Sequence, residues 1–159
     1  MLLLLARHAD AGVSDRSRWP DDGDRPLTDL GRATQRAMGL SLIGAGFSPA
    51  AVLSSSILRA RQTAEVIHEV CRVATPVVFS DALIKPSDLD AIAPEVAPFT
   101  DAPVVALVGH SPSMEEITSL LLVGSRDGLR TQFSKSAVMV IRTDGIAPGA
   151  GELVAFLQP

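Results

Sequence analysis

Cysteine and aromatic residues are scarce in this chain of 159 residues, which has one cysteine, one tryptophan and no tyrosine. A single cysteine excludes an intramolecular disulfide framework and a zinc site built from cysteines. Aromatic residues make up 4% of the chain and hydrophobic residues 47%, so the core must be aliphatic and rich in alanine. Such a core favours close packing of helices on a sheet over an aromatic-lined ligand pocket.

Excess basic charge and long apolar runs are also lacking. The formal net charge is −4 at pH 7, whereas a general nucleic-acid binder has an excess of Lys and Arg. No segment approaches the ~20 apolar residues of a membrane helix. The run Leu2–Leu5 lacks a basic flank and is too short for a secretory signal. We therefore expect a cytoplasmic protein that binds neither nucleic acid nor a membrane.

The pattern of apolar residues predicts one domain over residues 1–159, because no repeat or linker interrupts it. Short apolar runs typical of strands alternate with amphipathic segments typical of helices. Strands are expected at 2–6, 51–54, 77–79, 104–109, 137–142 and 152–156. Helices are expected from the N-cap Thr28 to about 44, over 56–72 and 87–97, and after an N-cap at Ser111. This alternation predicts an α/β fold, with helices on both faces of a mostly parallel sheet.

Chemistry-bearing residues follow three of the expected strands. Arg7 and His8 follow the first, Arg59 comes shortly after the second, and His110 follows the strand over 104–109. In sheets of this kind, ligands bind at the carboxyl ends of the strands. Two of the three histidines of the chain therefore stand where an active site is expected.

Arg59 is the sharpest physical indication of a ligand. If Ser55 or Ser56 caps the helix, Arg59 lies in its first turn, where the helix dipole is positive and an arginine is unfavourable without an anion. Helix N-terminal amides and a guanidinium both favour a tetrahedral oxyanion, and Arg7 would supply a second guanidinium. Together these residues predict a phosphate pocket that holds two histidines.

Plainer interpretations exist for each residue alone. Arg59 could be a surface salt-bridge partner, and His110 could be a hydrogen-bonded core histidine. Neither explains why Arg7, His8, Arg59 and His110 all fall at strand ends. A metal site is the other use of two histidines, but zinc or iron would favour carboxylates beside them over two guanidinium cations. We therefore expect no metal and no cofactor.

Four segments of the chain resemble, in order, the motifs of the histidine phosphatase superfamily, also called phosphoglycerate mutase-like. Residues 5–10 resemble its R-H-G signature, and residues 25–31 its P-L-T-x-x-G segment. Residues 53–64 resemble the S-x-x-x-R-A-x-Q-T-A block, and residues 108–112 the late G-H block. The resemblance implies a three-layer α/β/α sandwich of the phosphoglycerate mutase-like type.

The resemblance also implies roles for individual residues. His8 would be the nucleophile that forms a phosphohistidine intermediate. Arg7, Arg59 and His110 would hold the phosphoryl oxygens, and Arg25 would have a weaker role on the substrate side. The short chain, its opening and residues 133–137 are most similar to the small bacterial phosphohistidine phosphatases of the SixA type, which implies a phosphohistidine-bearing protein as substrate and a place in signal transduction.

The chain departs from the family pattern at two places. Ala9 stands where the family usually has glycine, so the backbone must tolerate a Cβ there. Residues 81–88 contain no glutamate, although many relatives carry a glutamate general acid in this region; Asp10, Asp81 and Asp88 are the candidate replacements. Because imidazole leaves more readily than an alkoxide, a site without a strong acid favours N–P bonds. A phosphatase of small phosphate monoesters, or a non-catalytic phosphate-binding module, remains the alternative.

Overall fold

The computed structural model describes residues 1–84 and 88–159. Its strands are β1 (Leu2–Arg7), β2 (Ala51–Ser54), β3 (Val78–Phe79), β4 (Val104–Gly109), β5 (Val138–Thr143) and β6 (Gly151–Leu157). Its helices are α1 (Asp29–Gly44), α2 (Leu58–Cys71), α3 (Leu89–Val96) and α4 (Ser113–Val123). Short 3-10 turns are η1 (Asp22–Asp24), η2 (Asp81–Leu83) and η3 (Ala97–Phe99). Every strand expected from the sequence is present, within one residue at either end.

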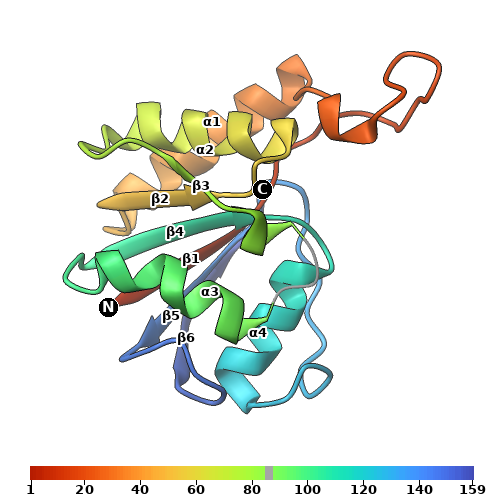
Figure 1. The fold of residues 1–159 in the computed structure, drawn as a ribbon. Coiled ribbons are helices and arrows are strands. Elements are labelled where there is room, and N and C mark those ends of the chain that lie inside the picture. The colour runs from red at the N-terminus through yellow and green to blue at the C-terminus, as the bar shows by residue number, and fades with distance from the viewer. Residues whose placement is uncertain (85–87) are drawn as a thin grey trace.

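The strands form one sheet in the order β3-β2-β4-β1-β5-β6 (Figure 1). The four strands from β3 to β1 are parallel, whereas β5 and β6 are antiparallel to their neighbours. β1 pairs with β4 along its whole length, from Leu2 opposite Val104 to Arg7 opposite Gly109. The predicted α/β fold with a mostly parallel sheet is confirmed.

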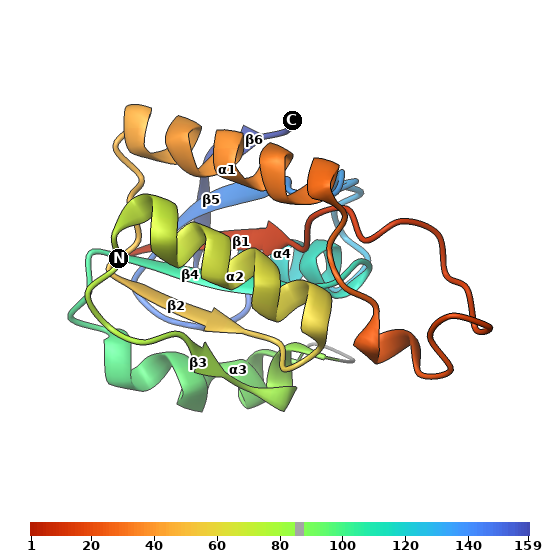
Figure 2. The same cartoon turned by 90° about the horizontal axis from the view of Figure 1, so that it is seen from above.

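Helices cover both faces of this sheet, so the molecule has three layers. Helices α1 and α2 lie on one face and α3 and α4 on the other (Figures 1 and 2). The side chains of β1 alternate between the two: Leu3 and Leu5 pack with α3 and α4, and Leu4 and Ala6 with α1 and α2. Since both faces of a parallel sheet are buried, its strands read as continuous apolar runs.

The start of α1 agrees with the sequence prediction. Thr28 is the N-cap, and its Oγ1 accepts a hydrogen bond from the amide of Gly31 at 2.9 Å. A Cβ on Gly31 would lie 2.1 Å from the backbone oxygen of Asp10. Only glycine therefore lets α1 approach the segment after β1, which explains the glycine of the P-L-T-x-x-G motif.

The predicted caps of the other helices need correction. Helix α2 begins after Ile57 and has no side-chain cap, although Ser55 Oγ accepts the Ile57 amide at 3.3 Å. The N-cap of α4 is Pro112, not Ser111, because the Ser111 hydroxyl donates to Glu115 instead. The cap expected at Ser87 lies outside the described residues, and Asp88 caps α3.

The described part of the chain holds no helix that combines the length and the apolar character needed to span a bilayer.

Candidate active site

The register of β1 and β4 brings the two predicted histidines together. Arg7 and Gly109 are paired across these strands, so His8 and His110, one residue further on, leave the sheet side by side. The His8 amide donates to the Gly109 carbonyl at 2.9 Å, and the centroids of the two imidazole rings are 5.2 Å apart. Both side chains are buried, at 8% and 6% exposure.

Hydrogen bonds fix which nitrogen of His8 can react. Nδ1 lies 2.7 Å from the carbonyl oxygen of Ala9, which can only accept, so Nδ1 carries the proton. Nε2 therefore holds the free electron pair, and Arg59 Nε donates to it at 3.3 Å. Ala9 is fully buried, so its Cβ is accommodated in place of the usual glycine.

The surroundings of His8 keep its ring neutral. Its pKa is lowered from 6.5 to about 3, and burial is the largest cause. The hydrogen bond to the Ala9 carbonyl raises the pKa, whereas the charges of His110, Arg59 and Arg7 lower it. A neutral imidazole at neutral pH is the form that can attack phosphorus.

Arg59 lies in the first turn of α2, where the sequence placed it, and its side chain is 13% exposed. Its Nη1 donates to the Asp22 backbone oxygen at 2.9 Å and reaches the Asp22 carboxylate at 3.3 Å. Arg59 therefore forms the salt bridge of the plainer interpretation and also contacts His8, while its role toward a phosphoryl group stays a prediction. One side of its guanidinium contacts Asp22, and the other contacts His8.

His110 is held from the turn between β2 and α2. Its Nε2 lies 2.9 Å from Ser55 Oγ, and both side chains are buried. Three strand ends therefore contribute to the cluster, as expected from the sequence: β1 through His8, β2 through Ser55 and Arg59, and β4 through His110.

Arg7 and Arg25 form their hydrogen bonds with residues other than the two histidines. Arg7 Nη1 donates to the Phe133 carbonyl at 2.5 Å, and its buried Nε has no hydrogen-bond partner among the described residues. Arg25 binds the Asp22 carboxylate through Nε at 2.9 Å and Nη2 at 3.1 Å, and its Nη1 donates to two backbone carbonyls. Arg25 is thus placed to hold Asp22, and its predicted role toward substrate stays a prediction.

A cavity of about 500 Å³ opens onto the cluster. Its lining is formed by His8, Asp21, Asp22, Gly23, Ile57, Arg59, Ile84, His110 and Ser111. The turn η1 and the end of η2 thus form part of the wall around the two histidines. An anion in this cavity would meet Arg59 and the imidazole of His8.

The candidate general acids do not line this cavity. Asp10 binds Lys135, Thr28 and the Gly12 amide, and the hydrogen bond from Lys135 is the main reason that its pKa is lowered. Asp81 accepts from Ser56, and Asp88 caps α3. The carboxyl that does contact Arg59 is Asp22, whose pKa its hydrogen bond with Arg25 lowers strongly. Asp22 is therefore a poor proton donor.

Sequence reasoning missed three residues that position the site. Asp22 and Ser55 contact Arg59 and His110, as described above. Thr63 accepts the Ala9 amide at 3.0 Å and donates to the Arg59 carbonyl at 2.7 Å, so it ties the segment after His8 to α2. The available signal for Thr63 was its place in the R-A-x-Q-T-A block, whereas nothing local marks Asp22.

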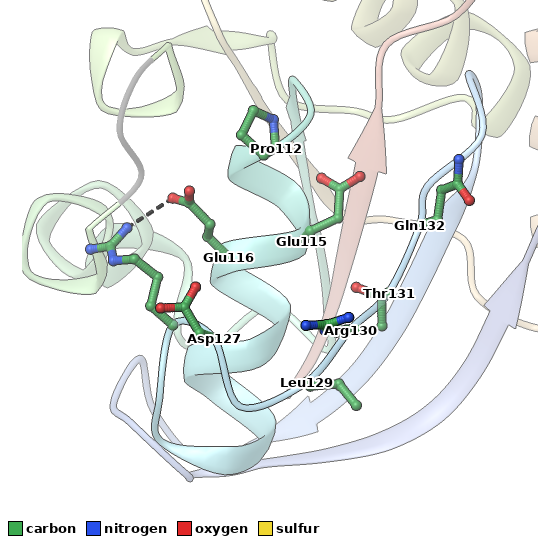
Figure 3. Close-up of a pocket in the computed structure, with 9 residues that line it drawn as sticks. Pro112, Glu115, Glu116, Asp127, Leu129, Arg130, Thr131 and Gln132 are labelled. Atoms are coloured by element: carbon green, nitrogen blue, oxygen red, sulfur yellow. Dashed lines mark hydrogen bonds and ion pairs between the residues drawn. The ribbon is translucent and has the colours of Figure 1, made fainter.

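A larger cavity of about 810 Å³ lies beside α4 (Figure 3). It contains no histidine, and Glu116 on α4 pairs with Arg126 at 2.9 Å. Within residues 1–84 and 88–159, no group of three or more His, Cys, Asp or Glu side chains is arranged to hold a metal ion.

Comparisons with known proteins place this geometry in a family. The model of the histidine phosphatase superfamily (branch 1) matches residues 3–85. An uncharacterised protein of Picosynechococcus sp. is 31% identical over 145 residues, which cover 90% of this chain and 86% of the relative. The residues that the family model matches include Arg7, His8 and Arg59.

Solved structures agree with the family model. The protein histidine phosphatase SixA, complexed with tungstate, superimposes with a TM-score of 0.84 at 24% identity, over 99% of this chain and 97% of that one. A candidate phosphohistidine phosphatase SixA of Nakamurella multipartitia gives 0.76 at 30% identity, over 99% and 95%. Mycobacterial glucosyl-3-phosphoglycerate phosphatase with VO3 gives 0.71 at 16%, over 99% of both chains. The chain therefore belongs to the histidine phosphatase superfamily, and this membership supports phosphatase activity.

Proposed function

We propose that this phosphatase removes the phosphoryl group from phosphohistidine on other proteins, and that His8 carries the group covalently between the two half-reactions. The observation that carries this proposal is the state of His8: a neutral ring whose Nε2 has a free electron pair 3.3 Å from the Nε of Arg59. Binding of phosphate alone would need no such nucleophile, which disfavours a non-catalytic module.

In the first step, His8 Nε2 attacks phosphorus, and the N–P bond to the substrate imidazole breaks. The leaving nitrogen takes a proton from solvent. In the second step, water attacks the phosphorus, the bond to Nε2 breaks, and inorganic phosphate is released with the electron pair returned to His8. Arg59, His110 and Arg7, whose Nε has no other partner among the described residues, would hold the phosphoryl oxygens. The proposal invokes no metal and no cofactor.

The lack of a proton donor favours an N–P substrate. An alkoxide must be protonated as it leaves, whereas an imidazole is easily protonated and departs readily. The Asp22 pKa is lowered, not raised, and Asp10, Asp81 and Asp88 are engaged elsewhere. The similar SixA structures support the same substrate class. Similar folds of phosphoserine and glucosyl-3-phosphoglycerate phosphatases keep small phosphate monoesters as the second candidate.

The proposal treats residues 1–159 as one phosphatase domain whose open cavity accepts a side chain presented by a partner protein. Its partners are then a phosphohistidine-bearing protein and, after turnover, phosphate. Oxyanions such as tungstate should bind between His8, Arg59 and His110, since a tungstate complex of a similar fold is known.

Radiolabelling of the phosphoryl group tests the covalent mechanism. A protein carrying radiolabelled phosphohistidine is mixed with the phosphatase, and the reaction is quenched rapidly at alkaline pH, where phosphohistidine survives. We expect label on His8 and none in His8→Ala. Rapid turnover without label on His8 would contradict the covalent mechanism.

Substrate class is tested separately. We expect a higher kcat/KM on a phosphohistidine-bearing protein than on sugar phosphates. The reverse order would favour the monoester alternative, and no turnover on either would leave only the binding module.

A further inference from the structure

Two carboxylates line the catalytic cavity, and two more are hydrogen-bonded to residues in its lining or next to it. Asp21 and Asp22 line it, Asp81 accepts from Ser56 at 2.6 Å in the turn that leads to Ile57, and Glu115 accepts from Ser111 at 2.6 Å. We call Asp21, Asp22, Asp81 and Glu115 the acidic rim. Glu115 also stands in the wall of the larger cavity in Figure 3, so the acidic rim continues toward α4.

Hydrogen bonds hold these carboxylates in place. Asp21 Oδ1 accepts the Gly23 amide at 2.8 Å, and Asp22 is gripped by Arg25 and by Ser14 Oγ at 2.7 Å. Glu115 Oε1 also accepts the Phe133 amide at 3.2 Å. The carboxylates of the acidic rim are therefore held in place. The charge of Asp22 is balanced by Arg25 and Arg59, so the negative charge of the acidic rim comes from its other three members.

Positive charge is concentrated below the acidic rim. Among the described residues that line the cavity, Arg59 is the permanent cation, and it lies against the buried His8. Arg25 is already bound to Asp22, and Arg16 and Arg18 of the same loop do not line the cavity. The floor thus suits a phosphoryl anion, whereas the mouth suits a neutral or cationic group.

In-line transfer places the leaving group on the side of phosphorus opposite His8. Because His8 is at the buried end of the cavity, the leaving group and the chain that carries it pass the acidic rim. We propose, on the basis of the proposed function, that the acidic rim selects protein substrates whose phosphohistidine is flanked by basic residues and disfavours those with acidic flanks. Electrostatic complementarity of this kind acts on encounter and on rejection of wrong partners.

Three phosphohistidine peptides test this selectivity, identical except that Lys, Gln or Glu flanks the phosphorylated residue on both sides. For the unmodified protein at low salt, we expect kcat/KM to fall from Lys to Gln to Glu, by about tenfold overall. In the double variant Asp21→Asn, Asp81→Asn the range should shrink to about threefold. Asparagine at 21 can still accept the Gly23 amide.

Asp101→Asn is the control, because it removes one carboxylate from an exposed residue before the N-terminal end of β4, whereas His110 follows the C-terminal end of that strand. This variant should keep the full range of kcat/KM across the three peptides. Raising the ionic strength to about 0.5 M should compress the range in the unmodified protein through screening.

The outcomes separate the two proposals. Cleavage of all three peptides with equal kcat/KM, or an unchanged range in the double variant, would overturn the role of the acidic rim and leave the proposed function intact. Failure to cleave any of the peptides would overturn the proposed function and this inference with it.

Discussion

Of the two cavities, the smaller one holds the reactive groups. The one beside α4 has about 810 Å³ and is lined by residues such as Arg126 and Glu116, which neutralise each other. The one at the strand ends has about 500 Å³, but it brings a guanidinium to within 3.3 Å of an imidazole nitrogen held neutral by burial. A site of chemistry is identified by converging groups whose charge states are perturbed, and volume alone does not identify it.

The largest effect that would test this contrast is removal of the nucleophile. His8→Ala should lower kcat on phosphohistidine substrates by at least about 10³-fold, because no other group can carry the phosphoryl intermediate. Stopped-assay release of phosphate measures it, with circular dichroism to confirm the fold. Residual turnover within tenfold of the parent would remove His8 from the mechanism.

A pair of arginines compares the two cavities directly. Arg59→Ala should lower kcat/KM about 10²-fold and weaken tungstate binding in calorimetry, whereas Arg126→Ala, which also loses a carboxylate partner, should change neither. Each change should cost about 1 kcal/mol of unfolding free energy or less, since Asp22 and Arg126 are each 39% exposed. A large stability loss with unchanged catalysis in Arg59→Ala would favour a purely structural salt bridge.

A pair of serines gives a smaller contrast. Ser55→Ala removes the partner of His110 Nε2, and a lost hydrogen bond of about 1 kcal/mol should lower kcat about fivefold to tenfold. Ser119→Ala removes a hydroxyl that bonds residues 125 and 129 at the larger cavity. It should destabilise the protein without changing kcat. Equal kcat values for both variants would refute a positioning role for Ser55.

The lowered pKa of His8 predicts that stability depends on pH. Between pH 6.5 and about 3 the unfolded chain binds a proton at His8 that the folded protein does not, so unfolding free energy falls as pH falls through this window. His8→Gln should flatten this dependence by up to about 1.4 kcal/mol per pH unit. Urea titrations between about pH 4 and pH 7 measure it; identical slopes would show that His8 titrates normally.

Sequence patterns predicted the strands well because each is a short apolar run buried on both faces. β2 and β4 have the expected bounds, and β1 extends one residue further, to Arg7. Helix starts were less predictable, because a hydroxyl caps a helix only where no other hydrogen-bond partner engages it. Ser111 was expected to cap α4, but its hydroxyl donates to Glu115 four residues away.

The residues of the site also fall into those that the sequence could predict and those that it could not. Arg7, His8, Arg59 and His110 could be named from their positions at strand ends and from the family resemblance. Asp22 could not, because its role arises from contacts with Arg25 and Arg59, the second of which is 37 residues away in the chain. The acidic rim is equally invisible in the sequence, since its members come from three separate segments.

The sequence by itself determined the layered α/β fold and the residues that meet at the strand ends. Short apolar runs indicate strands that are buried on both faces, and such strands form a mostly parallel sheet. Only the tertiary structure decided which nitrogen of His8 is free, how far its pKa falls, and which carboxylates lie in the cavity or next to it. Those properties depend on distances between groups remote in the chain, and electrostatic and hydrogen-bond energies act through space and not along the sequence.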